Sequence, residues 1–327
     1  EILHELKRAL VRIEGVVQKE VALHDGVRPL GAPAPLDGRN SRPLLEAQLS
    51  RMLTAKSAYK TRTTAAFTFA VAAVLVAAMG SASAGEPKSF KDCSVCPEMV
   101  VVPAGRFVMG AANSEPDEQP RREIRIPRSF AVGKYEITFA EWDACFAAGG
   151  CKRQPIDYGW GRGRQPVNDV AWSDIMREYL PWLSKTTGKT YRRLTEAEWE
   201  YSARAGSQSA FSWGDRVGRD NANCDGCGGA WDGSRTAPVG TFAANAFGLH
   251  DMHGNVWDWV QDCYHGDLGK VPGDGRAFNA EPCELRVVRG GSWLSEPDKL
   301  RSASRDRLHG VNRYSIAIGF RVARDLE

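Results

Sequence analysis

Apolar and polar residues alternate in short runs along the middle of the chain, which is typical of β-strands. In EMVVVPAGRFVMG, residues 98–110, two apolar runs rich in valine flank a Pro-Ala-Gly break. Since such a break is a turn signal, we expect a β-hairpin here. Strand-like alternation continues in REIRIPRSFAVGKYEIT, residues 122–138.

Three segments carry helix signals. Thr138 with Glu141, and Thr195 with Glu198, form two capping boxes, in which each side chain accepts the other residue's backbone amide. The second helix is expected to end at residue 206. The third is expected to run from residue 173 to 188 and to bend at Pro181, whose ring crowds the preceding turn.

Beyond residue 206 the chain is rich in Gly, Asp and Trp, and strand-like runs return only in RVVRGGSW and IGFRVARDL. Irregular segments of this length persist where cross-links, function or a bound ion order them. Few helices and many short strands predict a loop-rich α+β domain. Since no Pro/Ser/Gly linker interrupts residues 85–327, we expect them to form one domain.

Residues 52–84 read as a secretory signal peptide. A basic stretch precedes an apolar run over residues 65–79, and Ala82-Ser83-Ala84 supplies the small residues before the cut. Because the apolar run is shorter than the roughly 20 residues of a bilayer span, we expect cleavage and export to the periplasm or outside the cell. The alternative is a membrane anchor through residues 65–79. Residues 1–51 precede the signal and are not expected in the mature protein.

All eight cysteines follow this segment, as expected for disulfides in an exported domain. Sequence closeness favours the pairs 93–96, 145–151, 224–227 and 263–283, although connectivity does not follow from sequence. The alternative is a zinc site formed by CSVC and CDGC. A net charge of +3 and the lack of a dense basic stripe argue against nucleic-acid binding.

Carboxylates lie among large apolar residues in HDMHGNVWDW, residues 250–259. Calcium takes six to eight oxygens from mixed carboxylate and carbonyl sets. Side chains and backbone carbonyls could supply one such set here and another in residues 221–236; the candidates are Asp251, Gly254, Val256 and Asp258, and Asn223, Cys224, Asp232 and Ser234. The alternative is that the aspartates cap turns.

Seven sequence blocks in order resemble the formylglycine-generating enzyme (sulfatase-modifying factor) family, from about residue 98 to 324. They are MVVVPAGRFVMG, YEITFAEWDAC, PVNDVAWSD, YRRLTEAEWEYSARAG, TAPVGTFAANAFGLHDMHGNVWDWV, RVVRGGSWL and IGFRVAR. The resemblance implies an irregular fold related to C-type-lectin-like domains and built around structural calcium. It places the first candidate set on one calcium site of the family, and the second set on the other.

The family's formylglycine generators oxidise a client cysteine with oxygen and copper, which two cysteines after the Gly-Gly-Ser-aromatic block bind. Counting forward from Ser292 puts Ser295 and Leu300 at those places, and a gap in the loop from Arg301 puts other non-cysteine residues there. No cysteine follows Cys283. Copper(I) needs soft ligands, so we do not expect copper. Ergothioneine-pathway relatives bind non-haem iron through histidines. The region after residue 84 has only His250, His253, His265 and His309, so iron is not expected either.

Ser292 matches a serine in the family's active-site groove, and Arg301 and Arg305 follow it, so these three residues are the groove candidates. An arginine there could hold an anionic group, or both arginines could form buried ion pairs. Two functions stay open: a divergent oxidoreductase acting on a peptide or small metabolite, as in a relative that matures the pyoverdine chromophore, or a non-catalytic, lectin-like module that binds a peptide or protein. Whether the chain is an enzyme is left undecided.

Overall fold

The computed structural model describes residues 88–112, 114–309 and 313–326, which form an α+β fold with short strands and few helices, as predicted. The expected signal peptide and the segment before it lie outside the described residues. The strands are β1 Ser89–Phe90, β2 Met99–Val102, β3 Gly105–Met109, β4 Arg122–Ile126, β5 Phe130–Gly133, β6 Tyr191–Arg193, β7 Trp257–Cys263, β8 Leu285–Arg289, β9 Arg305–His309, β10 Ile318–Gly319 and β11 Val322–Asp325.

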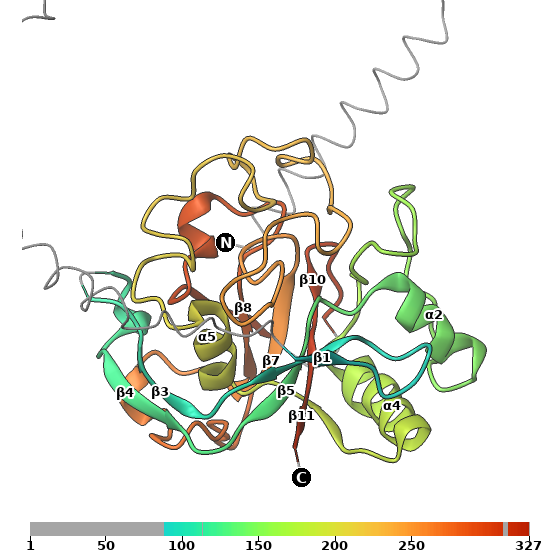
Figure 1. The fold of residues 1–327 in the computed structure, drawn as a ribbon, viewed down its shortest axis with the longest axis horizontal. Helices are drawn as coiled ribbons and strands as arrows, with labels where there is room; N and C mark the ends of the chain where they lie inside the picture. The colour runs from blue at the N-terminus through green and yellow to red at the C-terminus, as the bar shows by residue number, and fades with distance from the viewer. Residues whose placement is uncertain (1–87, 113, 310–312, 327) are drawn as a thin grey trace, which may run out of the picture. The chain divides into compact units, whose positions relative to one another are not determined.

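A five-stranded antiparallel sheet, in the order β1-β2-β5-β11-β6, joins distant parts of the chain (Figure 1). Its strand β11 comes from the end of the chain and pairs with β5 on one side and β6 on the other. All four residues of β5 are buried, which explains why FAVG lacks the alternation of a half-exposed strand. The last strand therefore joins β5 and β6, which come from the first half of the domain, in one sheet.

The hairpin predicted over residues 98–110 is wrong. Strand β2 pairs with β1 and β5, whereas β3 pairs only with β4 in a separate two-stranded sheet. The Pro-Ala-Gly break redirects the chain from one sheet to another instead of folding it back. Both apolar runs have the pattern of a strand with a buried side. The local sequence does not specify which other strand each of them pairs with.

A four-stranded sheet, in the order β10-β7-β8-β9, carries the helix α5, Glu196–Arg204, which packs against β7 and β8. Glu196 on this helix is fully buried and accepts a bidentate ion pair from Arg305, with N···O distances of 2.6 and 2.8 Å. Arg289 of β8 is equally buried and bonds Glu200, one turn further along the helix. Although burial opposes ionisation, Arg305 and Arg289 outweigh it and hold the pKa of Glu196 below its ordinary value.

The helix signals are largely confirmed. Both capping boxes form, at the start of α2, Phe139–Ala147, and of α5. In the third segment, α3, Trp172–Asp174, continues through a π-helical stretch, Ile175–Tyr179, into α4, Leu180–Thr187, which ends at a left-handed Gly188. The π-helical stretch ends two residues before Pro181, where a regular helix would lack one hydrogen bond.

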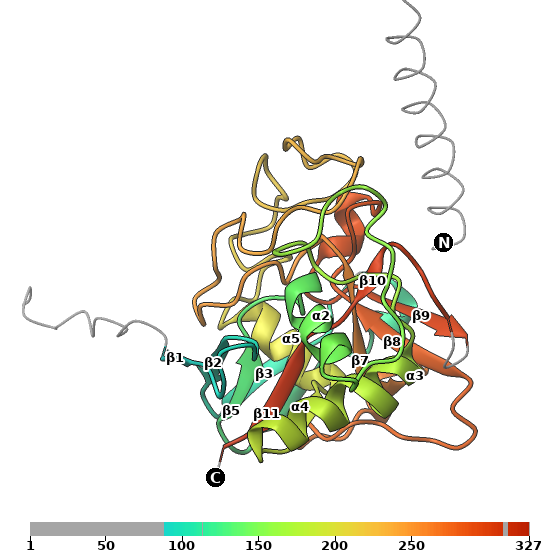
Figure 2. The ribbon, with the colours of Figure 1, turned by 90° about the vertical axis from the view of Figure 1, so that its right-hand side faces the viewer.

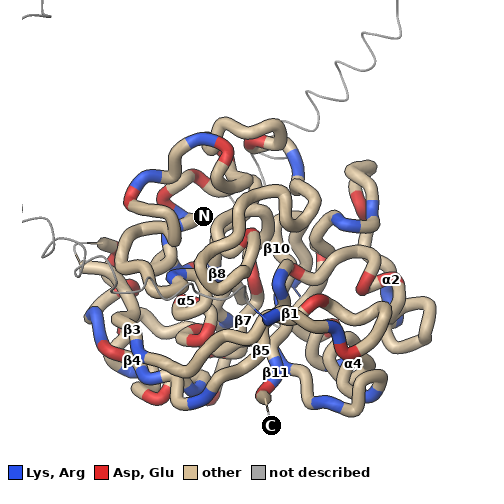
Figure 3. The backbone as a smooth tube through the Cα atoms, viewed as in Figure 1, with Lys and Arg blue, Asp and Glu red and all other residues tan. Residues whose placement is uncertain are grey.

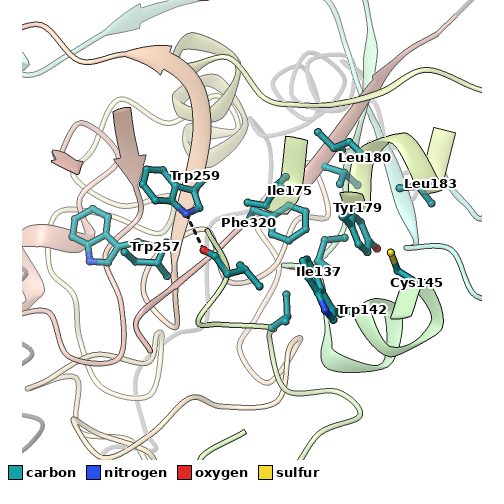
Figure 4. Packing of buried hydrophobic residues seen from close by; sticks show 14 of the residues in the cluster. Ile137, Trp142, Cys145, Ile175, Tyr179, Leu180, Leu183, Trp257, Trp259 and Phe320 are labelled. Carbon is teal, nitrogen blue, oxygen red and sulfur yellow. Dashed lines mark hydrogen bonds between the residues drawn. The ribbon is translucent and has the colours of Figure 1, made fainter. Parts of the chain in front are cut away.

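Large aromatic side chains fill the core between α2, α4 and the sheets (Figure 4). Trp142 of α2 is fully buried, stacks on Tyr179 at 5.5 Å between ring centroids and meets Phe320 edge-on at 6.3 Å. Its indole nitrogen donates to the Arg153 carbonyl at 2.9 Å. Trp259 likewise donates to the Val170 carbonyl. These residues explain the high tryptophan content of a chain with few long helices.

The long irregular segment between α5 and β7, residues 205–256, forms the loops at the top of Figure 2. All eight cysteines form disulfides, and the pairing is the one that sequence closeness favours: Cys93–Cys96, Cys145–Cys151, Cys224–Cys227 and Cys263–Cys283. A zinc site built from the two CxxC motifs is therefore excluded, since their thiolates are not free.

We expect Trp142→Ala to lower the free energy of unfolding by about 3–5 kcal/mol, because it removes a fully buried indole and leaves a cavity. Urea denaturation followed by circular dichroism measures the change. Ile156→Ala is the matched control, since Ile156 is 59% exposed and its loss should change stability by less than about 0.5 kcal/mol. Equal losses in the two variants would contradict this account of the core.

Candidate functional site

The turn that carries the first candidate calcium ligands is fixed by Gly254. Its φ is +94°, and a Cβ atom there would lie 2.3 Å from the Asn223 carbonyl oxygen, so only glycine fits. The Asn255 amide donates to the same carbonyl at 2.8 Å. The backbone of this turn is thereby tied to the loop that carries the second candidate set.

Asp251 and Asp258 are both buried, and each uses one carboxylate oxygen in hydrogen bonds. Asp251 Oδ2 accepts the Gly240 amide at 2.7 Å. Asp258 Oδ2 accepts Trp199 Nε1 at 2.9 Å and Arg321 Nε at 3.0 Å. The other oxygen of each carboxylate is buried and has no hydrogen-bond partner within the described residues. Such orphaned acceptors are costly unless a cation or water satisfies them.

Two further charged residues, which sequence reasoning missed, complete this cluster. Glu136 is fully buried and accepts the Val256 amide and the Asn255 side-chain amide. Burial, followed by the negative charge of Asp251, raises the pKa of Glu136 well above its usual range. Arg321, also fully buried, offsets part of this charge. The sequence feature that could have identified Glu136 is its position as an acidic residue inside the strand-like segment KYEIT, residues 134–138.

The first candidate set therefore fits a calcium ion in its chemistry. Burial raises the pKa values of Asp251 and Asp258, and a bound cation would oppose that effect. Across the described ranges no three His, Cys, Asp or Glu side chains converge on a point suited to a metal ion. Calcium would consequently need carbonyl oxygens, such as those of Gly254 and Val256, beside the two carboxylates.

The second candidate set is arranged differently. Asn223 is buried, and its side-chain oxygen has no hydrogen-bond partner in the described part of the chain. Asp232 is exposed and its Oδ1 accepts the amides of Gly226 and Cys227. The Cys224 carbonyl accepts the Gly233 amide, and the Ser234 hydroxyl donates to the Trp231 carbonyl. These contacts are those of an ordinary Asp-capped turn, and within the described residues the buried acceptor of this set without a partner is the Asn223 side-chain oxygen.

The histidines each have separate surroundings. His253 is buried, its Nδ1 lies 2.7 Å from the Leu300 carbonyl, and its Nε2 accepts the Ser212 amide. Burial lowers its pKa to about 4, so the ring is neutral and bridges two loops. His250 Nδ1 contacts the Phe242 carbonyl instead. The other two candidates, His265 and His309, belong to different segments.

The segment after Gly-Gly-Ser-Trp is closely packed. Ser292 and Ser295 are fully buried, and the Ser295 hydroxyl accepts the Ser292 amide at 2.9 Å. Leu300 is also fully buried, in a small cluster with Phe211 and the Cys224–Cys227 disulfide. The two places where the resemblance expects copper-binding cysteines thus hold a structural hydroxyl and an apolar core residue.

The three groove candidates lie in different environments. Arg305 has only 5% of its surface exposed and donates its hydrogen bonds to Glu196 and to backbone carbonyls. This agrees with the alternative of a buried ion pair. Ser292 has no exposed surface. Arg301 alone borders open space, and it pairs bidentately with Glu118 at 2.7 and 2.8 Å.

A cavity of about 660 Å³ opens beside this segment. It is lined by Asp298, Lys299 and Arg301, by residues 110–112, 114, 115 and 121, and by the end of α5 with the residues that follow it. Arg204 on α5 is held by Glu200 and by the Gly110 carbonyl. Four basic side chains, those of Arg121, Arg204, Lys299 and Arg301, face two acidic ones, Glu115 and Asp298. Because Arg204 and Arg301 are paired with Glu200 and Glu118, the cavity offers an anionic group well-placed guanidinium donors and no large excess of positive charge.

In the view of Figure 3, Lys and Arg are interspersed with Asp and Glu along the described chain. No helix in the described ranges is long and apolar enough to cross a bilayer.

Residues 84–326 match the family described as sulfatase-modifying factor enzyme 1-like domain. The formylglycine-generating enzyme of Mycobacterium tuberculosis is 28% identical, with 70% of this chain and 98% of that protein aligned. A serine/threonine-protein kinase pkn1 of Chlamydia caviae is 27% identical, but the alignment with 74% of this chain spans only 40% of the kinase. The solved structure of PvdO from Pseudomonas aeruginosa superposes with a TM-score of 0.68 at 41% identity, covering 74% of this chain and 99% of that one.

The family match spans the whole described domain, and its relatives include proteins of similar extent. The chain therefore belongs to the formylglycine-generating enzyme (sulfatase-modifying factor) family.

Proposed function

We propose that this chain is an exported, calcium-stabilised member of the family that binds an acidic peptide or metabolite and does not make formylglycine with thiol-bound copper. The observation that carries the proposal is the arginine-lined cavity beside a segment whose two expected thiol positions hold buried Ser295 and Leu300. Function is argued from this site, because family and fold alone do not determine it.

The thiol argument concerns the donor atoms. Every cysteine of the sequence is in a disulfide, so none offers the thiolate that copper(I) requires. A serine hydroxyl is a hard ligand and is already used in the hydrogen bond to Ser292. The residues present do not fit a copper site of the family's type.

The electrostatic argument concerns the cavity. Arg204 and Arg301 are largely neutralised by Glu200 and Glu118, which fixes their positions. Arg121 makes only a 3.4 Å contact with Gln208 and keeps its charge available at the rim. The wall holds no cysteine or histidine among the described residues, so binding is better supported than redox turnover. A peptide carboxylate or an acidic side chain matches these donors.

The proposals of calcium binding and of export are supported by separate features. The orphaned oxygens of Asp251 and Asp258 favour a structural cation in the turn that joins two long loops. Four disulfides favour an oxidising compartment, in line with the signal peptide expected over residues 52–84.

We expect the protein to consume no oxygen with a Cys-x-Pro-x-Arg peptide and added copper, because it has no free thiol. An oxygen electrode and mass spectrometry of the peptide measure this. The formylglycine-generating enzyme of M. tuberculosis serves as the active control. Conversion of the peptide cysteine to formylglycine would refute the proposal.

Removing calcium should lower the melting temperature by several degrees, and adding calcium should restore it, since a ligand at 100 times its Kd stabilises the folded state by about 2.7 kcal/mol. Differential scanning fluorimetry with and without chelator measures the shift. Asp251→Asn should abolish the calcium response, while Asp274→Asn, on an exposed turn, should keep it. A melting temperature that does not change when calcium is chelated would rule out the calcium site.

Arg121→Gln should weaken the binding of a tetraglutamate peptide about tenfold, because it removes one charge-assisted contact at the cavity rim. Isothermal titration calorimetry measures the affinity. Arg276→Gln is the matched control, since Arg276 is exposed, pairs with Asp274 and lies away from this cavity. If both variants bind as the unchanged protein does, the cavity is not the binding site.

A further inference from the structure

A second cavity, of about 480 Å³, lies between the third helical segment and the strands β6, β7 and β8. Its described lining holds three arginines and neither Asp nor Glu. One of them, Arg192, is neutralised by Glu198 and Asp325. The other two, Arg193 and Arg286, form no ion pair with any described residue. This cavity is separate from the one assigned to the proposed function.

Both unpaired guanidinium groups lie against the same indole. The central guanidinium carbon is 4.3 Å from the Trp172 ring centroid for Arg193 and 4.4 Å for Arg286. The Trp172 ring thus contacts both guanidinium groups. Figure 2 shows α3, which carries Trp172, beside the strands β7 and β8.

Neither arginine has its hydrogen-bonding capacity filled. Arg193 is only 2% exposed; it donates from Nη1 to the Val260 carbonyl, but its buried Nε has no partner in the described residues. Arg286 donates from Nη1 to the Gln261 carbonyl, and its Nε is likewise buried and unused there. A buried cation with open donors is costly unless an anion compensates it.

The surroundings supply little compensation. Burial, followed by the charge of Arg286, lowers the pKa of Arg193 to about 9. Asp262 attracts both arginines, but its oxygens already accept the amides of Glu196 and Phe278. Burial and the charge of Glu196 raise the pKa of Asp262 to about 7, so it is a weak counterion. Glu281 acts on Arg286 only at longer range.

The rest of the wall is apolar. Met176, 38% exposed, and the adjoining Leu180 and Pro181 lie along one side of the cavity. We propose that this cavity binds an organic anion, a carboxylate on a flat apolar body, with the carboxylate on Arg193 and Arg286 and the body against Met176 and Leu180. The indole of Trp172 acts as a positioning residue for the two guanidinium groups.

Calorimetric titration of the full domain with benzoate tests this, with benzamide as the uncharged ligand of the same shape and acetate as the carboxylate without a ring. We expect saturable binding of benzoate, at least tenfold weaker binding of benzamide, and weaker binding of acetate. Arg286→Gln and Arg193→Met should each weaken benzoate binding at least tenfold. Arg106→Gln, at an exposed arginine that lines neither cavity, should leave it unchanged.

Arg286 is half-exposed, so its glutamine variant should fold even if the Arg193 variant does not. Equal affinities for benzoate and benzamide, or no saturable benzoate binding, would overturn the proposal, and so would wild-type affinity in Arg286→Gln. Arg121→Gln, which alters the other cavity, should bind benzoate normally; a loss of benzoate binding in that variant would place the anion in the first cavity instead.

Discussion

The arrangement of the domain depends on a buried network of ion pairs between α5 and the four-stranded sheet. Glu196 and Glu200 project from consecutive turns of the helix onto Arg305 and Arg289, and all four side chains have almost no exposed surface. Desolvating such charges is expensive, and only matched partners with good geometry repay the cost. The network therefore specifies one position of α5 on the sheet, and a chain with so little regular structure needs that specificity. Because Arg204 continues the network to the wall of the first cavity, the shape of that cavity follows from the same constraint.

The turn at residues 251–258 also buries charged groups, but here some of their atoms have no partner. Burial raises the pKa values of three carboxylates, those of Glu136, Asp251 and Asp258, and Arg321 is the main cation that opposes this rise. Two carboxylate oxygens stay unsatisfied, whereas Trp142 and Trp259 in the core each find a carbonyl for their indole nitrogen. Buried polar atoms without a partner occur in the core as well, at the Tyr179 hydroxyl and at Trp257 Nε1. Those of Asp251 and Asp258 support the proposed calcium site, and those of Arg193 and Arg286 support the proposed organic-anion cavity.

Much of the fold was predictable where the signal is local. Capping boxes act within three residues, so Thr138 and Thr195 were found at once, and cysteines close in sequence paired as expected. Prediction failed where a partner lies far along the chain. The runs on either side of Pro103 joined different sheets, and Ser292 proved buried instead of facing open space. Arg193 and Arg286 lie 93 residues apart, and only the tertiary structure brings them to one indole.

The four disulfides share one topological property: each cysteine is joined to the next cysteine along the chain, at separations of 3, 6, 3 and 20 residues. A chain oxidised progressively as it emerges from a translocation pore would form these bonds in order, because the correct partner is always the nearest thiol still available. Maturation along that route would depend on an oxidase and would place little demand on an isomerase. The same locality means that a reductant would open small rings without unlinking one sheet from another.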